Sequence, residues 1–202
     1  MFEENQHYRA FLAVTPSEEI KSELRDINRK FKKYARNFRF VPLDQLHITL
    51  QFMGNGVSGY SLDVIKNNLS ILCDDWNAFD VKIDKLNFGF PDQNVATHLY
   101  YSIEDDSELN QLTKSIHENV KDLGLADVNK KKDHGKLINH ITVARVKGHT
   151  SRSFTREVKD FVNSIEIQNM NFAISEVKII SSVFKDNTTS YFNLATFELK
   201  KG

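Results

Sequence analysis

The chain has 202 residues, 40% of them apolar, and its 27 lysine and arginine residues balance 27 aspartate and glutamate residues. These values predict a folded domain with a hydrophobic core, and they argue against a disordered chain or a protein that coats nucleic acid by bulk charge. The single cysteine, Cys73, allows no intramolecular disulfide and fits a reducing cytosol, and the sequence shows neither a signal-peptide pattern nor a membrane-spanning apolar run.

Strand and helix patterns alternate through the first half of the chain. Residues 8–14 are apolar and rich in β-forming types, which predicts a strand. Thr15-Pro16-Ser17-Glu18 then predicts a helix start that is capped by Thr15 and has Pro16 at its first position. Residues 38–41 and 46–53 are expected to be extended, the second stretch ending at Gly54-Asn55-Gly56. Apolar residues at helical spacing mark two helices, one through Ile20, Leu24, Ile27 and Phe31 and one through Leu62, Ile65, Leu69 and Leu72.

The second half continues this alternation. Residues 79–88 and 96–103 predict two strands joined by a turn at Pro91-Asp92. A third helix is expected to open at Asp105 or Asp106 and to end at Gly124, and the acidic run 104–106 is interpreted as its N-terminus rather than as a metal site. A strand over 139–146, a helix around 158–165 and a closing pair of strands over 170–183 and 191–199 complete the prediction.

This order of elements predicts an α+β fold. Strands outnumber helices and often follow one another directly, which favours antiparallel sheets packed by helices. A strand, a helix and a strand bearing His-Ile-Thr occupy the first quarter of the chain. A strand, a long helix and a second His-Ile-Thr follow later, so the chain repeats itself loosely.

The repeated segments are His47-Ile48-Thr49-Leu50 and His140-Ile141-Thr142-Val143. Residues two apart in a strand share a face, so each histidine points the same way as its threonine while the aliphatic residues face a core. If the two strands lie side by side, two imidazoles and two hydroxyls converge on one groove. Histidine and threonine are also ordinary strand residues, so the pattern by itself is a hypothesis.

Such a groove suits phosphodiester cleavage without a metal. A neutral imidazole accepts a proton from water while an imidazolium donates one to the leaving oxygen, and a pKa of roughly 6.5 allows both forms near neutral pH. Thr49 and Thr142 can hydrogen-bond phosphate oxygens or hold the water, and Arg145 can neutralise developing charge. The sequence has no zinc-type Cys/His spacing and no glycine-rich phosphate loop, so we expect no metal and no cofactor.

The sequence resembles the 2H phosphoesterases, specifically the RNA 2′,3′-cyclic phosphodiesterases also described as 2′-5′ RNA ligases. The resemblance covers nearly the whole chain. Beyond the two motifs, it is carried by Arg9-Ala10-Phe11-Leu12-Ala13-Val14, the stretch 40–46, Phe88-Gly89-Phe90-Pro91, Ser181-Ser182-Val183, Tyr191 and Phe197-Glu198-Leu199.

The resemblance implies one bilobal domain over residues 1–202, with two interleaved lobes, pseudo-twofold symmetry, two antiparallel sheets lining a central cleft and helices outside. It implies hydrolysis of 2′,3′-cyclic phosphate ends of RNA or nucleotides to 2′-phosphates, with His47 and His140 as catalytic residues and Thr49 and Thr142 binding the phosphate. We expect a cytoplasmic monomer that binds RNA or a nucleotide and no membrane.

The resemblance also places Phe52 and Arg145 beside the nucleotide. Each lies five residues after a motif histidine, and simple alternation puts that offset on the opposite face of the strand. Both residues therefore require a bulge or a late twist in their strands if they are to reach the groove.

Several positions depart from the family pattern or stand outside it. Gln51 occupies a position where many relatives have Arg, which removes a positive charge near the site, and Asn139 replaces a common Pro. The run Lys130-Lys131-Lys132 could steer RNA, although a solvated loop is the simpler interpretation. His98 and His134 are interpreted as structural or solvated rather than as site residues.

Some alternatives stay open. Cleavage of 2′-5′-linked oligonucleotides or of ADP-ribose cyclic phosphate would use the same groove. A nucleotide sensor without turnover would keep it too, and Gln51 is the sequence feature that favours this function. We expect His140 to activate water held by Thr142 and His47 to protonate the leaving oxygen, although the two roles could be reversed.

Overall fold

The computed structural model describes residues 2–3, 6–91, 95–104, 107–123, 138–168, 170–185 and 188–201. Four α-helices occur within these residues: α1 Glu18–Arg29, α2 Gly59–Cys73, α3 Ser107–Asp122 and α4 Arg152–Asn163. Two short 3₁₀ helices are η1 Lys30–Tyr34 and η2 Leu43–Gln45. The strands of the same residues are β1 His7–Val14, β2 Phe38–Phe40, β3 Ile48–Ser58, β4 Phe79–Phe88, β5 His98–Ile103, β6 His140–Val146, β7 Asn171–Ile174, β8 Glu176–Lys185 and β9 Thr188–Glu198.

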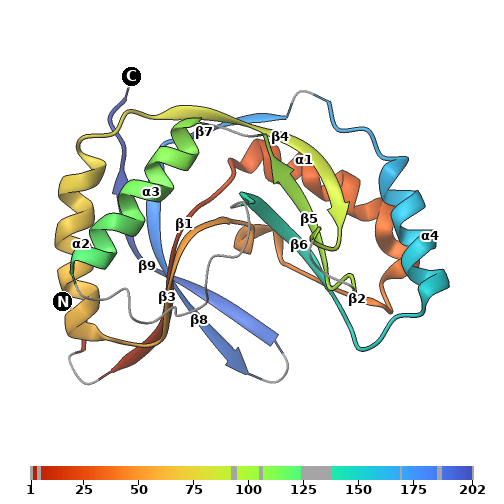
Figure 1. The fold of residues 1–202 in the computed structure, drawn as a ribbon, viewed down its shortest axis with the longest axis horizontal. Coiled ribbons are helices and arrows are strands. Elements are labelled where there is room, and N and C mark those ends of the chain that lie inside the picture. The colour runs from red at the N-terminus through yellow and green to blue at the C-terminus, as the bar shows by residue number, and fades with distance from the viewer. Residues whose placement is uncertain are drawn as a thin grey trace.

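The named strands form one curled antiparallel sheet. Its order is β7-β4-β5-β6-β3-β1-β8-β9, and β2 pairs beside β6. The two halves of the sheet meet where Ile48 of β3 pairs with Ile141 of β6. Figure 1 shows α2 and α3 beside the half that contains β1, β3, β8 and β9, and α1 and α4 beside the half that contains β4, β5 and β6. The predicted α+β class, with antiparallel strands and outer helices, is confirmed, and the two expected sheets are joined edge to edge.

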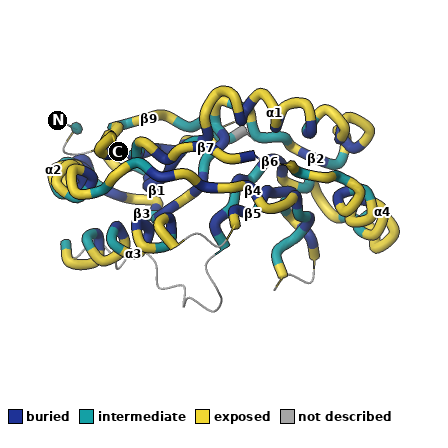
Figure 2. The backbone as a smooth tube through the Cα atoms, turned by 90° about the horizontal axis from the view of Figure 1, so that it is seen from above, coloured by how far each residue is buried: buried dark blue, intermediate teal, exposed yellow. Residues whose placement is uncertain are grey.

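Buried apolar side chains hold the helices against the sheet. Ile20, Leu24 and Ile27 form the buried face of α1. The Phe31 ring packs edge-on against the Phe161 ring of α4, with 5.0 Å between centroids. Figure 2 shows buried segments running along the strands while the helices keep an exposed outer face. The short helix η1 and α4 thus pack together through aromatic contacts, with Tyr34 of η1 also lying against α4, and these contacts hold that lobe around its strands.

Two predicted boundaries in the first half were wrong. Ser17, not Thr15, caps α1, because its Oγ accepts a hydrogen bond from the Ile20 N–H at 3.3 Å. Strand β3 continues through the Gly54-Asn55-Gly56 segment to Ser58. Gly54 has a φ of 130° and pairs with Ala10 at a register shift of the β1–β3 ladder. The glycine therefore accommodates a bulge inside a long strand rather than a turn.

The single strand expected over 170–183 is two strands, β7 and β8. Strand β7 pairs with β4 in one lobe, and β8 pairs with β1 in the other. The chain therefore changes lobes at Ser175, which lies between them. The expectations at Asp92, Asp105, Asp106, Gly124, Lys130-Lys131-Lys132 and His134 fall outside the described residues. In the part of the chain that is described, no helix is long and apolar enough to cross a membrane.

Candidate active site

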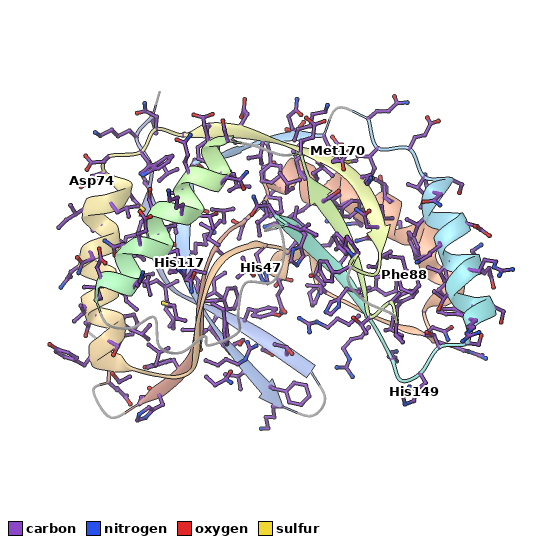
Figure 3. The ribbon with its side chains drawn as sticks, in the orientation of Figure 1. His47, Asp74, Phe88, His117, His149 and Met170 are labelled. Carbon is purple, nitrogen blue, oxygen red and sulfur yellow. The ribbon has the colours of Figure 1, made fainter. Side chains whose placement is uncertain are left out.

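The two His-Ile-Thr motifs meet at the junction of the lobes. His47 directly precedes β3 and His140 begins β6. Continuing the antiparallel register outward from the Ile48–Ile141 pair sets His47 beside Thr142 and Thr49 beside His140. Figure 3 shows His47 in the middle of the molecule, between the two lobes. The structure thus brings together the four polar residues that the sequence singled out.

Both imidazoles are held by the same type of hydrogen bond. The Nδ1 of His47 lies 2.7 Å from the Gln45 carbonyl oxygen, and the Nδ1 of His140 lies 2.7 Å from the Ile138 carbonyl oxygen. A carbonyl oxygen only accepts, so each Nδ1 must carry the proton. In the neutral ring, Nε2 is then a free acceptor, which is the form that a general base requires.

A phenylalanine and a tyrosine pack against each of these histidines. Each lobe therefore contains the same arrangement around its own motif histidine. Ring centroids lie 4.9 and 5.1 Å from His47 for Phe11 and Tyr191, and 5.0 and 5.5 Å from His140 for Phe90 and Tyr100. The aromatic walls leave each ring little freedom to rotate and exclude water from its faces.

Burial lowers the pKa of both histidines below the ordinary value of 6.5. The hydrogen bonds to Gln45 and Ile138 raise each pKa in part, whereas the positive charge of Arg145 lowers both. For His47, the nearby His140 lowers the pKa as well. Without a ligand, both rings therefore favour the neutral form at neutral pH.

Phe52 and Arg145 reach the same face as the histidines because each motif strand contains a bulge. In the β1–β3 ladder, Ala13 pairs with Thr49 and Leu12 pairs with Gln51, so Leu50 is the extra residue of a bulge. In the β5–β6 ladder, Tyr100 pairs with Thr142 and Leu99 pairs with Ala144, so Val143 is the extra residue of a bulge. Each extra residue follows its motif histidine by three positions and reverses the alternation beyond it. The requirement for a bulge is therefore met in both strands at the corresponding position.

The bulge in β3 leaves Phe52 in a small apolar cluster with Phe11, Ala13, Ile180 and Tyr191. The guanidinium of Arg9 lies over the Phe52 ring, 4.8 Å from its centroid. This guanidinium also donates to the Ser182 hydroxyl at 2.6 Å. Arg9 and Tyr191 belong to segments that carry the family resemblance, but the sequence alone did not indicate a role for either residue.

His98 is closer to the site than the sequence indicated. It pairs across β5 and β6 with Arg145, and its ring centroid lies 5.6 Å from that of Phe90. Burial, followed by the positive charges of Arg145 and His140, lowers its pKa to about 4. His98 lies beside Arg145 only because β5 pairs with β6, and the local sequence does not indicate which strands pair.

The two positions that depart from the family pattern have partners of their own. Gln51 pairs opposite Leu12 and lies 2.9 Å from Nδ1 of His117 on α3, so its side chain faces the helix. The side-chain amide of Asn139 is buried and donates to Asn110 of α3 at 2.9 Å. Both residues tie a motif strand to α3.

A cavity of about 530 Å³ opens beside the histidines. Gln45 and Tyr191, which contact His47, lie at its wall, but His47 and His140 themselves do not line it. Its wall also includes Arg9, Arg39, Arg145, Lys147 and Phe184. Among the described residues, no group of three or more His, Cys, Asp or Glu side chains could hold a metal ion.

Comparison with known proteins finds related sequences and similar folds. The chain matches the family model of the 2′-5′ RNA ligase superfamily over residues 15–183. It is 25% identical to a protein of Methanothermobacter thermautotrophicus named RNA 2′,3′-cyclic phosphodiesterase, over 95% of this chain and 98% of that one. A protein of the same name from Archaeoglobus fulgidus is also 25% identical, over 94% and 99% of the two chains.

Two solved structures have a similar fold. The crystal structure of TT0787 of Thermus thermophilus has a TM-score of 0.78 at 20% identity and covers 96% of this chain and 98% of that chain. Apo LigT of E. coli has a TM-score of 0.71 at 18% identity, over 98% and 100% of the two chains. Since the family model spans most of the sequence, the chain belongs to the 2′-5′ RNA ligase superfamily, within the 2H phosphoesterases that its two motifs resemble.

Proposed function

We propose that this protein hydrolyses 2′,3′-cyclic phosphate ends of RNA or nucleotides to 2′-phosphomonoesters, with His47 and His140 as an acid–base pair. The matched Nδ1 hydrogen bonds, both 2.7 Å to a carbonyl two residues upstream, carry the proposal. They select one tautomer on both rings and leave both Nε2 atoms available to a substrate. The relatives named RNA 2′,3′-cyclic phosphodiesterase support the substrate class.

The reaction needs one proton removed and one supplied. His140 accepts a proton from water that Thr142 holds, and the water oxygen attacks phosphorus as the bond from phosphorus to the 3′ oxygen breaks. His47 donates its proton to that 3′ oxygen, which leaves a 2′-phosphate and a free 3′ hydroxyl. Thr49 and Arg145 hydrogen-bond the phosphate oxygens as negative charge develops.

A lowered pKa suits His140, which acts as the base. It suits His47, which acts as the acid, only when a bound substrate restores its proton. Burial, and to a smaller extent the charge of Arg145, lowers the pKa of His140, which favours the neutral ring that must accept a proton. His47 must be protonated, although burial lowers its pKa. An anionic cyclic phosphate bound beside it favours the charged imidazolium, so the substrate itself prepares the acid.

Two variants and a matched control test this function. His47→Ala and His140→Ala should each lower kcat/KM on a 2′,3′-cyclic nucleotide by roughly 10²–10⁴-fold. His149→Ala is the control, because His149 is exposed and lies beyond the end of β6, far from His47 in Figure 3. Full activity in either site variant would contradict the two-histidine mechanism.

The product and the substrate range separate the remaining alternatives. A 2′-phosphate product supports the leaving-group assignment, whereas a 3′-phosphate would reverse it. A 2′-5′-linked dinucleotide and ADP-ribose cyclic phosphate, assayed in parallel, distinguish the rival diesterase activities. Binding of nucleotide without turnover of any of them would identify a sensor. We expect EDTA to leave the rate unchanged, because imidazoles make both proton transfers.

A further inference from the structure

The cavity beside the histidines is strongly basic. Four of its lining residues are cationic, Arg9, Arg39, Arg145 and Lys147, and none of its lining residues is acidic. Within the described ranges of the chain, no carboxylate forms an ion pair with any of the four. A concave surface with positive charge of this kind concentrates anions.

Two of these cations are placed directly opposite each other. Arg39 of β2 pairs with Arg145 of β6 in the antiparallel ladder, and both line the cavity. Like charges in directly opposite positions destabilise a sheet, and anions bound at the two guanidinium groups, one at each, would offset that cost. Arg145 also pairs with His98, which lies beside the site histidines. Arg39 and Arg145 therefore link the site to the outer part of the cavity.

An exposed aromatic ring lies at the other side of the cavity. Phe184 pairs with Thr189 near the turn of the β8–β9 hairpin, and both residues line the cavity. The Phe184 side chain is 65% exposed, which is unusual for phenylalanine and leaves its ring open for stacking. Aromatic rings next to a basic groove are the elements that bind single-stranded nucleic acid, because bases stack while cations hold phosphates.

We propose that this cavity binds the RNA strand on the 5′ side of the cyclic phosphate, so that the protein prefers oligoribonucleotides to cyclic mononucleotides. Arg39 and Lys147 bind internucleotide phosphates, and Phe184 stacks on a base. His47 and His140 do not line the cavity, so the strand can occupy it while the terminal cyclic phosphate lies at the histidines. This inference rests on the proposed function for the terminal group.

The kinetic test compares a cyclic mononucleotide with a tetranucleotide that ends in the same cyclic phosphate. For the unmodified protein, kcat/KM should be about tenfold or more higher on the tetranucleotide. The Arg39→Gln/Lys147→Gln double variant should lose most of this advantage and keep its kcat/KM on the mononucleotide. Both side chains are exposed, so the fold should tolerate the change. Arg156→Gln/Lys159→Gln, on the exposed face of α4, is the control with equal charge loss.

A binding measurement keeps this inference separate from the proposed function. A 5′-labelled tetranucleotide with a 3′-phosphate end is titrated with protein at several salt concentrations, and fluorescence anisotropy gives Kd without any turnover. Loss of two phosphate contacts in the double variant should reduce the slope of log Kd against log salt by about 1.4. Phe184→Ala should weaken binding about tenfold.

Three outcomes would overturn the inference. The unmodified protein could cleave both substrates equally well, the double variant could lose both activities together, or tetranucleotide binding could be unchanged in the double variant. If no cyclic phosphate is cleaved at all, the proposed function fails, while the salt dependence of binding still decides whether the cavity holds an RNA strand.

Discussion

Ile48 of β3 pairs with Ile141 of β6, and this pair joins the two lobes where both histidine motifs lie. Both isoleucines are fully buried, and each stands between a histidine and a threonine. A slip of one residue in either strand would turn the histidine and threonine into the core and the isoleucine out of it. One apolar contact thereby sets the register of four polar side chains.

Shortening Ile141 should therefore affect stability strongly. Ile141→Ala should lower the free energy of unfolding by about 2–5 kcal/mol, and Ile141→Val by about 0.5–1.5 kcal/mol, because each leaves a cavity in a packed core. Urea denaturation followed by circular dichroism measures both. Ile71→Ala is the control, since Ile71 is 69% exposed on α2, and it should change stability by less than about 0.5 kcal/mol. Equal losses at positions 141 and 71 would contradict the packing argument.

Acid should destabilise the protein partly through His98. Its pKa is about 4 in the folded chain against an ordinary 6.5, so between these values the unfolded state binds more protons. The stabilisation from the neutral ring is complete above pH 6.5 and is lost as the pH falls toward 4. In thermal melts over this range, His98→Gln should show a smaller fall in melting temperature than the unmodified protein. An identical pH dependence in both proteins would show that folding does not lower the pKa of His98.

Removing the charge of Arg145 should raise the pKa of its histidine neighbours. Its positive charge lowers the pKa of His98, His140 and His47, after the larger effect of burial. Arg145→Gln should therefore move the NMR titration midpoints of these imidazoles upward. Arg152→Gln at the exposed start of α4 keeps them in place. Unchanged midpoints in Arg145→Gln would place its guanidinium away from the imidazoles.

Local periodicity accounts for the parts of the site that could be predicted from sequence. The alternation in each His-Ile-Thr segment correctly separated the buried isoleucines from the polar residues, and residues 79–88 form β4 as expected. The division of β7 from β8 was missed, although the apolar pattern marks it by shifting from Phe172 and Ile174 to Val177 and Ile179. A strand that keeps one register cannot make that shift.

Strand pairing explains what the sequence could not predict. His98 and Arg39 reach Arg145 only because β5 and β2 both pair with β6. Phe184 reaches the cavity only because the β8–β9 hairpin extends beside β1. These partners lie far apart in the chain, and their meeting depends on how the whole sheet packs rather than on local propensity.

The bulge at Leu50 predicts opposite results for two neighbouring residues, Gln51 and Phe52. Gln51 faces α3 through His117, whereas Phe52 lies beneath Arg9 on the face of the histidines. Gln51→Ala removes the side-chain hydrogen bonds to His117 and to the Phe52 carbonyl oxygen. It should therefore lower the free energy of unfolding by about 1–3 kcal/mol, at a usual net value of about 0.5–1.5 kcal/mol for each bond, and leave kcat/KM unchanged.

Phe52→Leu keeps an apolar side chain but removes the ring beneath Arg9, so KM for a cyclic nucleotide should rise. Steady-state kinetics with urea denaturation of both variants separates the two effects. Loss of activity in Gln51→Ala with none in Phe52→Leu would mean that β3 keeps simple alternation, and that the charge lost at position 51 belongs to the cleft after all.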